Sequence, residues 1–92
     1  MSKNYKLICY TEQTCPPCES MGTYPLDSAT AKGYEFEEIM LTRINNGEDW
    51  ANKPLEDFWA TPWFKLENLD DDSTVDSFYG GNKPRLDIMM EK

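Results

Sequence analysis

The 92-residue sequence contains no histidine, few basic residues and no long apolar run. Without histidine it lacks the commonest general base and the commonest zinc ligand of proteins. Nine Lys and Arg against 17 Asp and Glu give a net charge of −8, which argues against nucleic-acid binding, because phosphate recognition needs clustered positive charge. The same charge argues against binding to anionic membranes, and no stretch reaches the ~20 apolar residues of a membrane span. The net negative charge permits docking on basic or mixed surfaces.

The beginning of the chain and its size predict a small cytoplasmic protein. Met1 to Asn4 lead straight toward a strand, with no apolar signal segment. Three cysteines are an odd number, whereas a secreted disulfide scaffold of this size usually has four or more in even number. We therefore expect a monomer in a reducing cytoplasm, with residues 1–92 forming one domain.

The apolar pattern predicts an α/β fold with a four-stranded mixed sheet flanked by helices. The nearly continuous apolar run at 5–10 is typical of a central strand, and a polar turn follows at 11–14. A helix opens at Pro16, breaks near Pro25 and stops at Gly33. The order β-α-β-α-β-β-α is completed by strands at 34–41, 61–67 and 74–79, a helix on the sheet at 54–60 and a closing helix from Asn82.

Two of the three cysteines, Cys15 and Cys18, lie three positions apart with Pro16 and Pro17 between them. A disulfide across so small a ring adds little chain-entropy stabilisation, so it is better suited to be made and broken. A helix N-terminus lowers a thiol pKa through its dipole and unpaired N–H groups. We expect Cys15 to be the exposed attacking thiol at the helix cap, and Cys18, one turn inside, to be the more buried resolving thiol.

The neighbours of the cysteine pair predict a moderate lowering of the thiol pKa and a reducing potential of about −200 to −270 mV. Neither proline has an N–H to offer the sulfur, and Glu12 and Glu19 oppose a thiolate. Cys9 lies in the first strand, where it is either a small buried hydrophobe or a regulatory thiol. A structural zinc site needs four ligands, and Cys9 is the only further cysteine, so we expect no metal and no permanently bound cofactor.

The Cys-Pro-Pro-Cys pair after the first strand, Thr61-Pro62 before the third and Gly80-Gly81 after the fourth resemble the glutaredoxin branch of the thioredoxin fold. The likeness covers essentially the whole chain, whose brevity is similar to the phage-type glutaredoxins. In that family the proline at the position of Pro62 is cis and lies against the disulfide. The resemblance also implies that the backbone of Thr61 pairs with the γ-glutamyl-cysteinyl part of glutathione.

The resemblance implies a substrate site formed by seven residues around the two cysteines. The Gly-Gly turn and the following helix N-terminus would receive the γ-glutamyl carboxylate of glutathione. Two positions depart from the family pattern and weaken tight glutathione binding: Glu12 stands where a basic residue is common, and Asn82-Lys83 replaces a polar or acidic pair. The implied substrate-binding residues are Pro16, Pro17, Thr61, Pro62, Gly80, Gly81 and Asn82.

The leading hypothesis is a dithiol oxidoreductase that reduces protein disulfides or glutathione mixed disulfides. Glutathione or a thioredoxin reductase would recycle it, and the resemblance suggests ribonucleotide reductase as an electron acceptor. A phage-encoded chain would act in the host cytoplasm. Two alternatives stay open: a dimer in which Cys15 from two chains and two glutathiones hold a [2Fe–2S] cluster, and an acidic docking module whose thiols are incidental.

Overall fold

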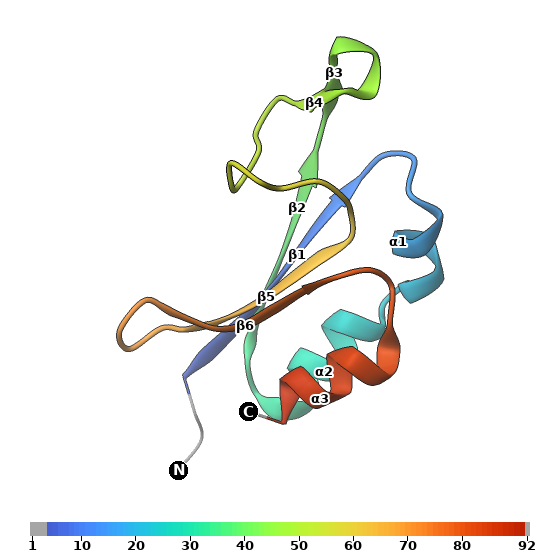
Figure 1. The fold of residues 1–92 in the computed structure, drawn as a ribbon. Coiled ribbons are helices and arrows are strands. Elements are labelled where there is room, and N and C mark those ends of the chain that lie inside the picture. Colours follow the sequence, from blue (N-terminus) through green and yellow to red (C-terminus); the bar gives the residue numbers. More distant parts are fainter. Residues whose placement is uncertain (1–3, 92) are drawn as a thin grey trace.

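The computed structural model describes residues 4–91, so residues 1–3, on which the expectation of no signal segment partly rests, lie outside it. Four strands form one mixed sheet in the order β2-β1-β5-β6 (Figure 1). β1 (Tyr5–Glu12) runs parallel to β2 (Glu35–Leu41) and antiparallel to β5 (Trp63–Asn68), and β6 (Ser73–Tyr79) pairs antiparallel with β5. The predicted four-stranded mixed sheet is confirmed. β1 continues through Glu12, two residues beyond the expected strand, which shortens the turn before the cysteines.

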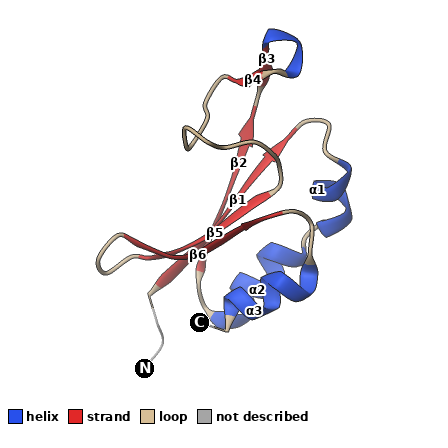
Figure 2. Cartoon of the chain, viewed as in Figure 1, coloured by secondary structure: helices blue, strands red, loops and turns tan. Residues whose placement is uncertain are grey.

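Three α-helices lie within residues 4–91, and the break expected near Pro25 falls earlier, at Gly22 and Thr23, because Pro25 lies in the first turn of the second helix, where proline is tolerated. α1 (Pro16–Met21) and α2 (Tyr24–Lys32) are two pieces separated at Gly22, and α2 ends at Gly33 in the left-handed conformation, with φ 74°. The closing helix is α3 (Lys83–Met90), capped by the Asn82 side chain. α2 and α3 lie side by side on one face of the sheet (Figures 1 and 2).

The core on this face is mainly aliphatic. β1 and β5 contribute Leu7, Phe64 and Leu66, all fully buried, and α3 contributes Leu86 and Met89, also fully buried. These residues alternate along the strands and recur at helical spacing, so one side of each element is apolar. We call this set, together with Cys9, Met21, Ala29 and Met90, the helix-side core.

The helix predicted at 54–60 is absent, and this is a correction to the expected order of elements. After β2 the chain forms a small hairpin of β3 (Arg43–Ile44) and β4 (Asp49–Trp50) around the 3-10 turn η1 (Asn45–Gly47), and then runs without regular structure to Pro62. The apolar spacing was misleading because Leu55 and Trp59 are exposed, whereas Phe58 is buried. Pro54 breaks the segment, and isolated aromatic residues rather than a helical stripe cover the sheet.

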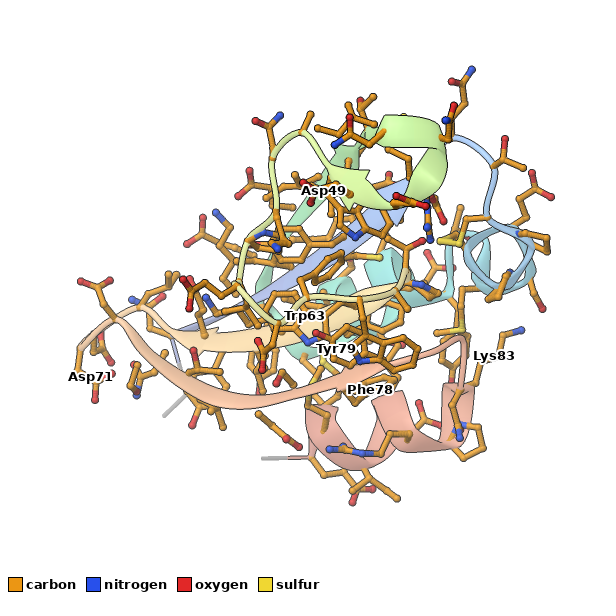
Figure 3. All side chains as sticks on the ribbon, turned by 45° about the horizontal axis from the view of Figure 1, so that its top comes forward. Asp49, Trp63, Asp71, Phe78, Tyr79 and Lys83 are labelled. Carbon is orange, nitrogen blue, oxygen red and sulfur yellow. A yellow bond between two sulfur atoms is a disulfide. The ribbon has the colours of Figure 1, made fainter. Side chains whose placement is uncertain are left out.

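An aromatic cluster on the second face of the sheet takes the place of the missing helix. Phe58 lies edge-on to Trp50 and Trp63, with ring centroids 5.1 and 5.8 Å away. Trp63 also stacks on Tyr79 at 5.9 Å, and Figure 3 shows these two residues together on neighbouring strands. We call Trp50, Phe58, Trp63 and Leu41, with the half-buried Tyr10, Ile39 and Tyr79 around them, the aromatic cluster.

Candidate active site

The cysteine pair lies between the end of β1 and the first turn of α1. Cys15 and Cys18 form a disulfide with their Cα atoms 5.2 Å apart. Cys15 is the N-cap of α1, and its sulfur accepts a hydrogen bond from the Cys18 N–H at 3.2 Å. The expected helix start is therefore confirmed, and the Cys18 amide is a donor to a sulfur to which neither intervening proline can donate. Such a donor favours the charged form of a thiol.

The relative burial of the two cysteines is the reverse of the expectation. Cys15 is only 3% exposed, whereas Cys18 is half-buried. The expectation of an exposed Cys15 is wrong because it considered only the position of Cys15 at the helix end. In the folded chain the loop before β5 also lies against this end of α1, and the Thr61 hydroxyl is 3.5 Å from the Cys15 sulfur.

The peptide bond between Thr61 and Pro62 is cis, which confirms what the resemblance implied for this proline. Pro62 is buried and lines a cavity of about 100 Å³ together with Cys18 and Cys9.

Cys9 is 5% exposed. Its burial, and to a smaller extent the nearby Glu38 charge, raises the pKa of its thiol to about 12. Cys9 is therefore a buried hydrophobe, and a regulatory role would require a thiolate that is absent near neutral pH.

The turn between β6 and α3 also reaches the cysteine motif. A Cβ atom added to Gly81 would lie 2.8 Å from the carbonyl oxygen of Pro17, so the turn packs against α1 without room for a side chain. The Gly80 N–H donates to the Pro62 carbonyl oxygen at 2.8 Å, and the Asn82 side chain accepts from the Arg85 N–H at 3.0 Å. The structure brings the turn to the site, but the Gly80 and Arg85 amides are already hydrogen-bonded. The remaining residue of the motif, Pro16, is exposed at the start of α1.

Sequence reasoning missed a hydrogen-bonded chain that links the β3–β4 hairpin to the Cys15–Cys18 disulfide. The Arg43 guanidinium binds both oxygens of Glu12, at 2.6 and 3.3 Å, and the Glu12 carboxylate accepts from the Thr61 hydroxyl at 2.8 Å. Arg43 is itself held by the Gly47 carbonyl oxygen at 3.0 Å and lies 4.2 Å over the Trp50 ring. The sequence did carry a signal for this contact. Parallel strands in register end at the same edge of the sheet; Glu12 is the last residue of β1, and Arg43 follows shortly after Leu41, which is paired with Glu12 and is the last residue of β2.

The Glu12 carboxyl is ionised in this arrangement. Partial burial acts to raise its pKa, but hydrogen bonds from Arg43 and Thr61 outweigh burial, so that the pKa lies below its ordinary value. From the sequence, Glu12 was expected to oppose a thiolate at the cysteines and to weaken glutathione binding. The structure shows instead that its charge is neutralised by Arg43 and that its oxygen is directed to Thr61.

Within residues 4–91, no group of three or more cysteine, aspartate or glutamate side chains lies close enough to hold a metal ion. None of the helices described is long and apolar enough to cross a membrane.

Comparison with known proteins relates the chain to solved thioredoxins by structure. No model of a protein family matches the sequence, and no curated protein matches it. A thioredoxin from Fasciola hepatica superposes with a TM-score of 0.74 at 19% identity, covering 98% of this chain and 81% of its own. The germline-specific thioredoxin Deadhead from Drosophila melanogaster gives 0.73 at 15% identity, covering 97% and 80%. A Trichomonas vaginalis thioredoxin gives 0.71 at 18% identity, covering 98% and 79%.

These likenesses settle the fold. The sheet order, the helices on one face and the cis proline beside the cysteines were each described above from this chain alone, and the superposition extends over nearly all of it. At such low identity the likeness shows the fold alone. The chain has a thioredoxin fold that carries a Cys15–Cys18 disulfide at the N-terminus of its first helix.

Proposed function

We propose that this protein is a dithiol–disulfide oxidoreductase. The observation that carries the proposal is the Cys15–Cys18 disulfide, placed at the N-terminus of α1 and beside Thr61 in a thioredoxin fold. The ring that it closes is too small to stabilise the fold by much, and the only other cysteine is buried in β1. A bond of this kind is suited to exchange with disulfides of other molecules.

In the proposed reaction the reduced protein transfers two electrons to a substrate disulfide. The Cys15 thiolate attacks one substrate sulfur; the substrate S–S bond breaks and the other substrate sulfur leaves as a thiolate, which takes a proton. The Cys18 thiolate then attacks the Cys15 sulfur of the mixed disulfide, releasing the first substrate sulfur as the second thiol. The products are the Cys15–Cys18 disulfide and a substrate dithiol.

The assignment of Cys15 as the attacking thiol rests on its hydrogen bond from the Cys18 N–H and on its position at the helix cap. Both features favour a thiolate. The burial of Cys15 in the oxidised form opposes a thiolate, because desolvation disfavours the charged form of the thiol. We therefore propose that the reduced pair opens toward solvent at Cys15 before substrate is attacked.

The proposal also covers the substrates of the protein, the residues that bind them and the reductant that recycles the disulfide. We propose protein disulfides or glutathione mixed disulfides as substrates, with ribonucleotide reductase as one acceptor, and Pro16, Pro17, Thr61, Pro62, Gly80, Gly81 and Asn82 as the substrate-binding residues. Among the similar solved structures is a thioredoxin f2 in complex with ferredoxin:thioredoxin reductase, which supports a reductase as the source of electrons. Glutathione stays the alternative reductant suggested by the glutaredoxin-like motifs.

We also propose that the 92 residues act as a single domain and a monomer in the cytoplasm of the cell, or of the host cell if a phage encodes them. The net charge of −8 supports a preference for substrates with neutral or basic surroundings at the disulfide.

Turnover assays with two reductants test this proposal. The protein is given a small mixed disulfide or a protein disulfide, and NADPH consumption is followed with glutathione and glutathione reductase or with a thioredoxin reductase. Wild-type protein should turn over with at least one system, and Cys15→Ser should abolish turnover with both. Cys18→Ser should keep only glutathione-dependent turnover of mixed disulfides. Loss of that turnover in Cys18→Ser would reverse the two roles, and an inactive wild-type protein would contradict the proposed function.

A further inference from the structure

The Thr61 hydroxyl lies between two acceptors and has one hydrogen to donate. The Glu12 carboxylate oxygen is 2.8 Å from the hydroxyl oxygen, and the Cys15 sulfur is 3.5 Å from it. A carboxylate is a much stronger acceptor than a disulfide sulfur, and it is also the closer of the two here. The hydrogen therefore points to Glu12, and an oxygen lone pair faces Cys15.

Glu12 is held in place from its far side. Arg43 binds both Glu12 oxygens, and the guanidinium is itself fixed by the Gly47 carbonyl oxygen and the Trp50 ring. The Glu12 side chain is 14% exposed, and that of Arg43 41%. Four of the five residues of this chain, all but Glu12, lie between β2 and β5, in the segment that contains the β3–β4 hairpin and the loop where a helix was expected.

We propose that Glu12 is a positioning residue for the redox reaction: its carboxylate, fixed by Arg43, takes the hydrogen of the Thr61 hydroxyl and so withholds it from the sulfur of Cys15. This inference rests on the proposed function for its purpose, but the hydrogen-bonded chain can be tested without any substrate.

The arrangement favours the protonated thiol of reduced Cys15 over the thiolate. The thiol donates its own hydrogen to the Thr61 oxygen, while a thiolate at the same place faces a lone pair and keeps only the Cys18 N–H as donor. The charged groups linked to the sulfur through Thr61 are Glu12 from β1 and Arg43 from the hairpin; Glu19 lies in the first turn of α1, and Cys18 is the disulfide partner. Destabilising the thiolate makes the dithiol pair a stronger reductant, because a stabilised reduced form is what makes such proteins oxidants.

The test measures the thiolate of Cys15 in the reduced protein. The rate of iodoacetamide alkylation is followed against pH, and peptide mass spectrometry separates Cys15 from Cys18. Four forms make a double-mutant cycle: wild type, Glu12→Gln, Thr61→Val and the double variant. Glu37→Gln is the matched control, since Glu37 also forms an ion pair, with Lys6 at 2.6 Å, but belongs to another part of the sheet.

We expect Glu12→Gln to lower the Cys15 pKa by about one unit, a tenfold rise in thiolate below the pKa. This follows because the hydroxyl is then free to donate to the sulfur. The shift should be at least halved in the Thr61→Val background, and Thr61→Val alone should not raise the pKa. Thr61→Ser, which keeps the hydroxyl, should leave the Cys15 pKa at its wild-type value, and so should Glu37→Gln.

Three results would overturn the proposal. A pKa raised by Thr61→Val would mean that the hydroxyl serves the sulfur rather than Glu12. An equal shift on Glu12→Gln in both backgrounds would mean that the charge acts through space, and no shift would mean that Glu12 does not act on Cys15. If the wild-type protein fails in every turnover assay while the cycle behaves as expected, the proposed function fails and the hydrogen-bonded chain stands.

Discussion

The two faces of the sheet are covered in different ways. On one face, α2 and α3 bury the helix-side core, with Leu7, Leu66 and Leu86 fully inaccessible. On the other face, an irregular segment buries the aromatic cluster through single rings such as Phe58 and Trp50. Regular elements bury an apolar stripe, whereas the loop buries separate side chains one at a time. The comparison predicts that packing on the first face stabilises the whole fold. Packing on the second face stabilises the segment that carries Arg43 and Thr61.

Removal of a ring from the helix-side core has the largest expected effect. Phe64 is fully buried between the sheet and the helices, and it stacks on Phe78 at 5.0 Å. Phe64→Ala should lower the free energy of unfolding by about 3–5 kcal/mol, from lost burial and the cavity left behind. Urea unfolding followed by far-ultraviolet circular dichroism measures this. A loss below about 1 kcal/mol would contradict a tightly packed core on this face.

The matched change on the other face is Phe58→Ala. Phe58 is also buried, at 4% exposure, and contacts four other rings. The loop that carries it can collapse, so we expect a smaller loss, of about 2–3 kcal/mol. Native-state hydrogen exchange should show faster exchange in residues 43–61 while the amides of β1 and β5 stay protected. Equal losses and equal exchange patterns for the two phenylalanines would remove the distinction between the faces.

High pH should weaken the helix-side core through Cys9. The folded-state pKa is about 12 against an ordinary 9.0, so above pH 9 the unfolded chain releases this proton before the folded protein does. The contribution of the Cys9 thiol to the free energy of unfolding is complete below pH 9 and is lost as pH rises toward 12. By pH 10 the loss is about 1 kcal/mol. Urea midpoints of the reduced protein at pH 8 and 10 measure the loss, and Cys9→Ala should lose about 1 kcal/mol less over the same interval. An equal loss in that variant would contradict the raised pKa.

The smallest effect is expected at the edge of the aromatic cluster. Trp59 is 68% exposed, and its ring lies 4.9 Å from that of Tyr79. Trp59→Ala should lower the free energy of unfolding by only about 0.5–1 kcal/mol, the usual contribution of one aromatic contact. Chemical denaturation gives this value, with Trp59→Phe as the control that keeps a ring. A loss comparable to that of Phe58→Ala would mean that the aromatic cluster extends to the surface.

The sequence predicted the helix-side half of the fold well and the other half poorly, for a physical reason. The apolar run from Tyr5, the prolines that open α1 and Gly33 are local signals, and each sets the backbone of its own neighbourhood. The conformation of the 43–62 segment depends instead on rings that meet residues far away in sequence, as Phe58 meets Tyr10 and Tyr79.

The candidate active site was predictable in the same uneven way. Cys15 at the cap of α1 follows from the spacing of two cysteines and two prolines, and the cis bond before Pro62 agrees with the resemblance. The burial of Cys15 and the contact of Glu12 with Thr61 were not predictable, because both arise where the loop before β5 meets the end of β1. Only the folded chain brings these together.

The close approach of Gly81 to Pro17 has a consequence for substitutions in and around the cysteine motif. The atom nearest to the missing Cβ is the carbonyl oxygen of Pro17, with the Pro17 Cβ at 3.3 Å. The main chain, more than the proline ring, therefore meets the β6–α3 turn. A side chain at position 81 would meet this carbonyl oxygen whichever residue stands at position 17, so the glycine is required by the backbone of the cysteine motif rather than by its proline.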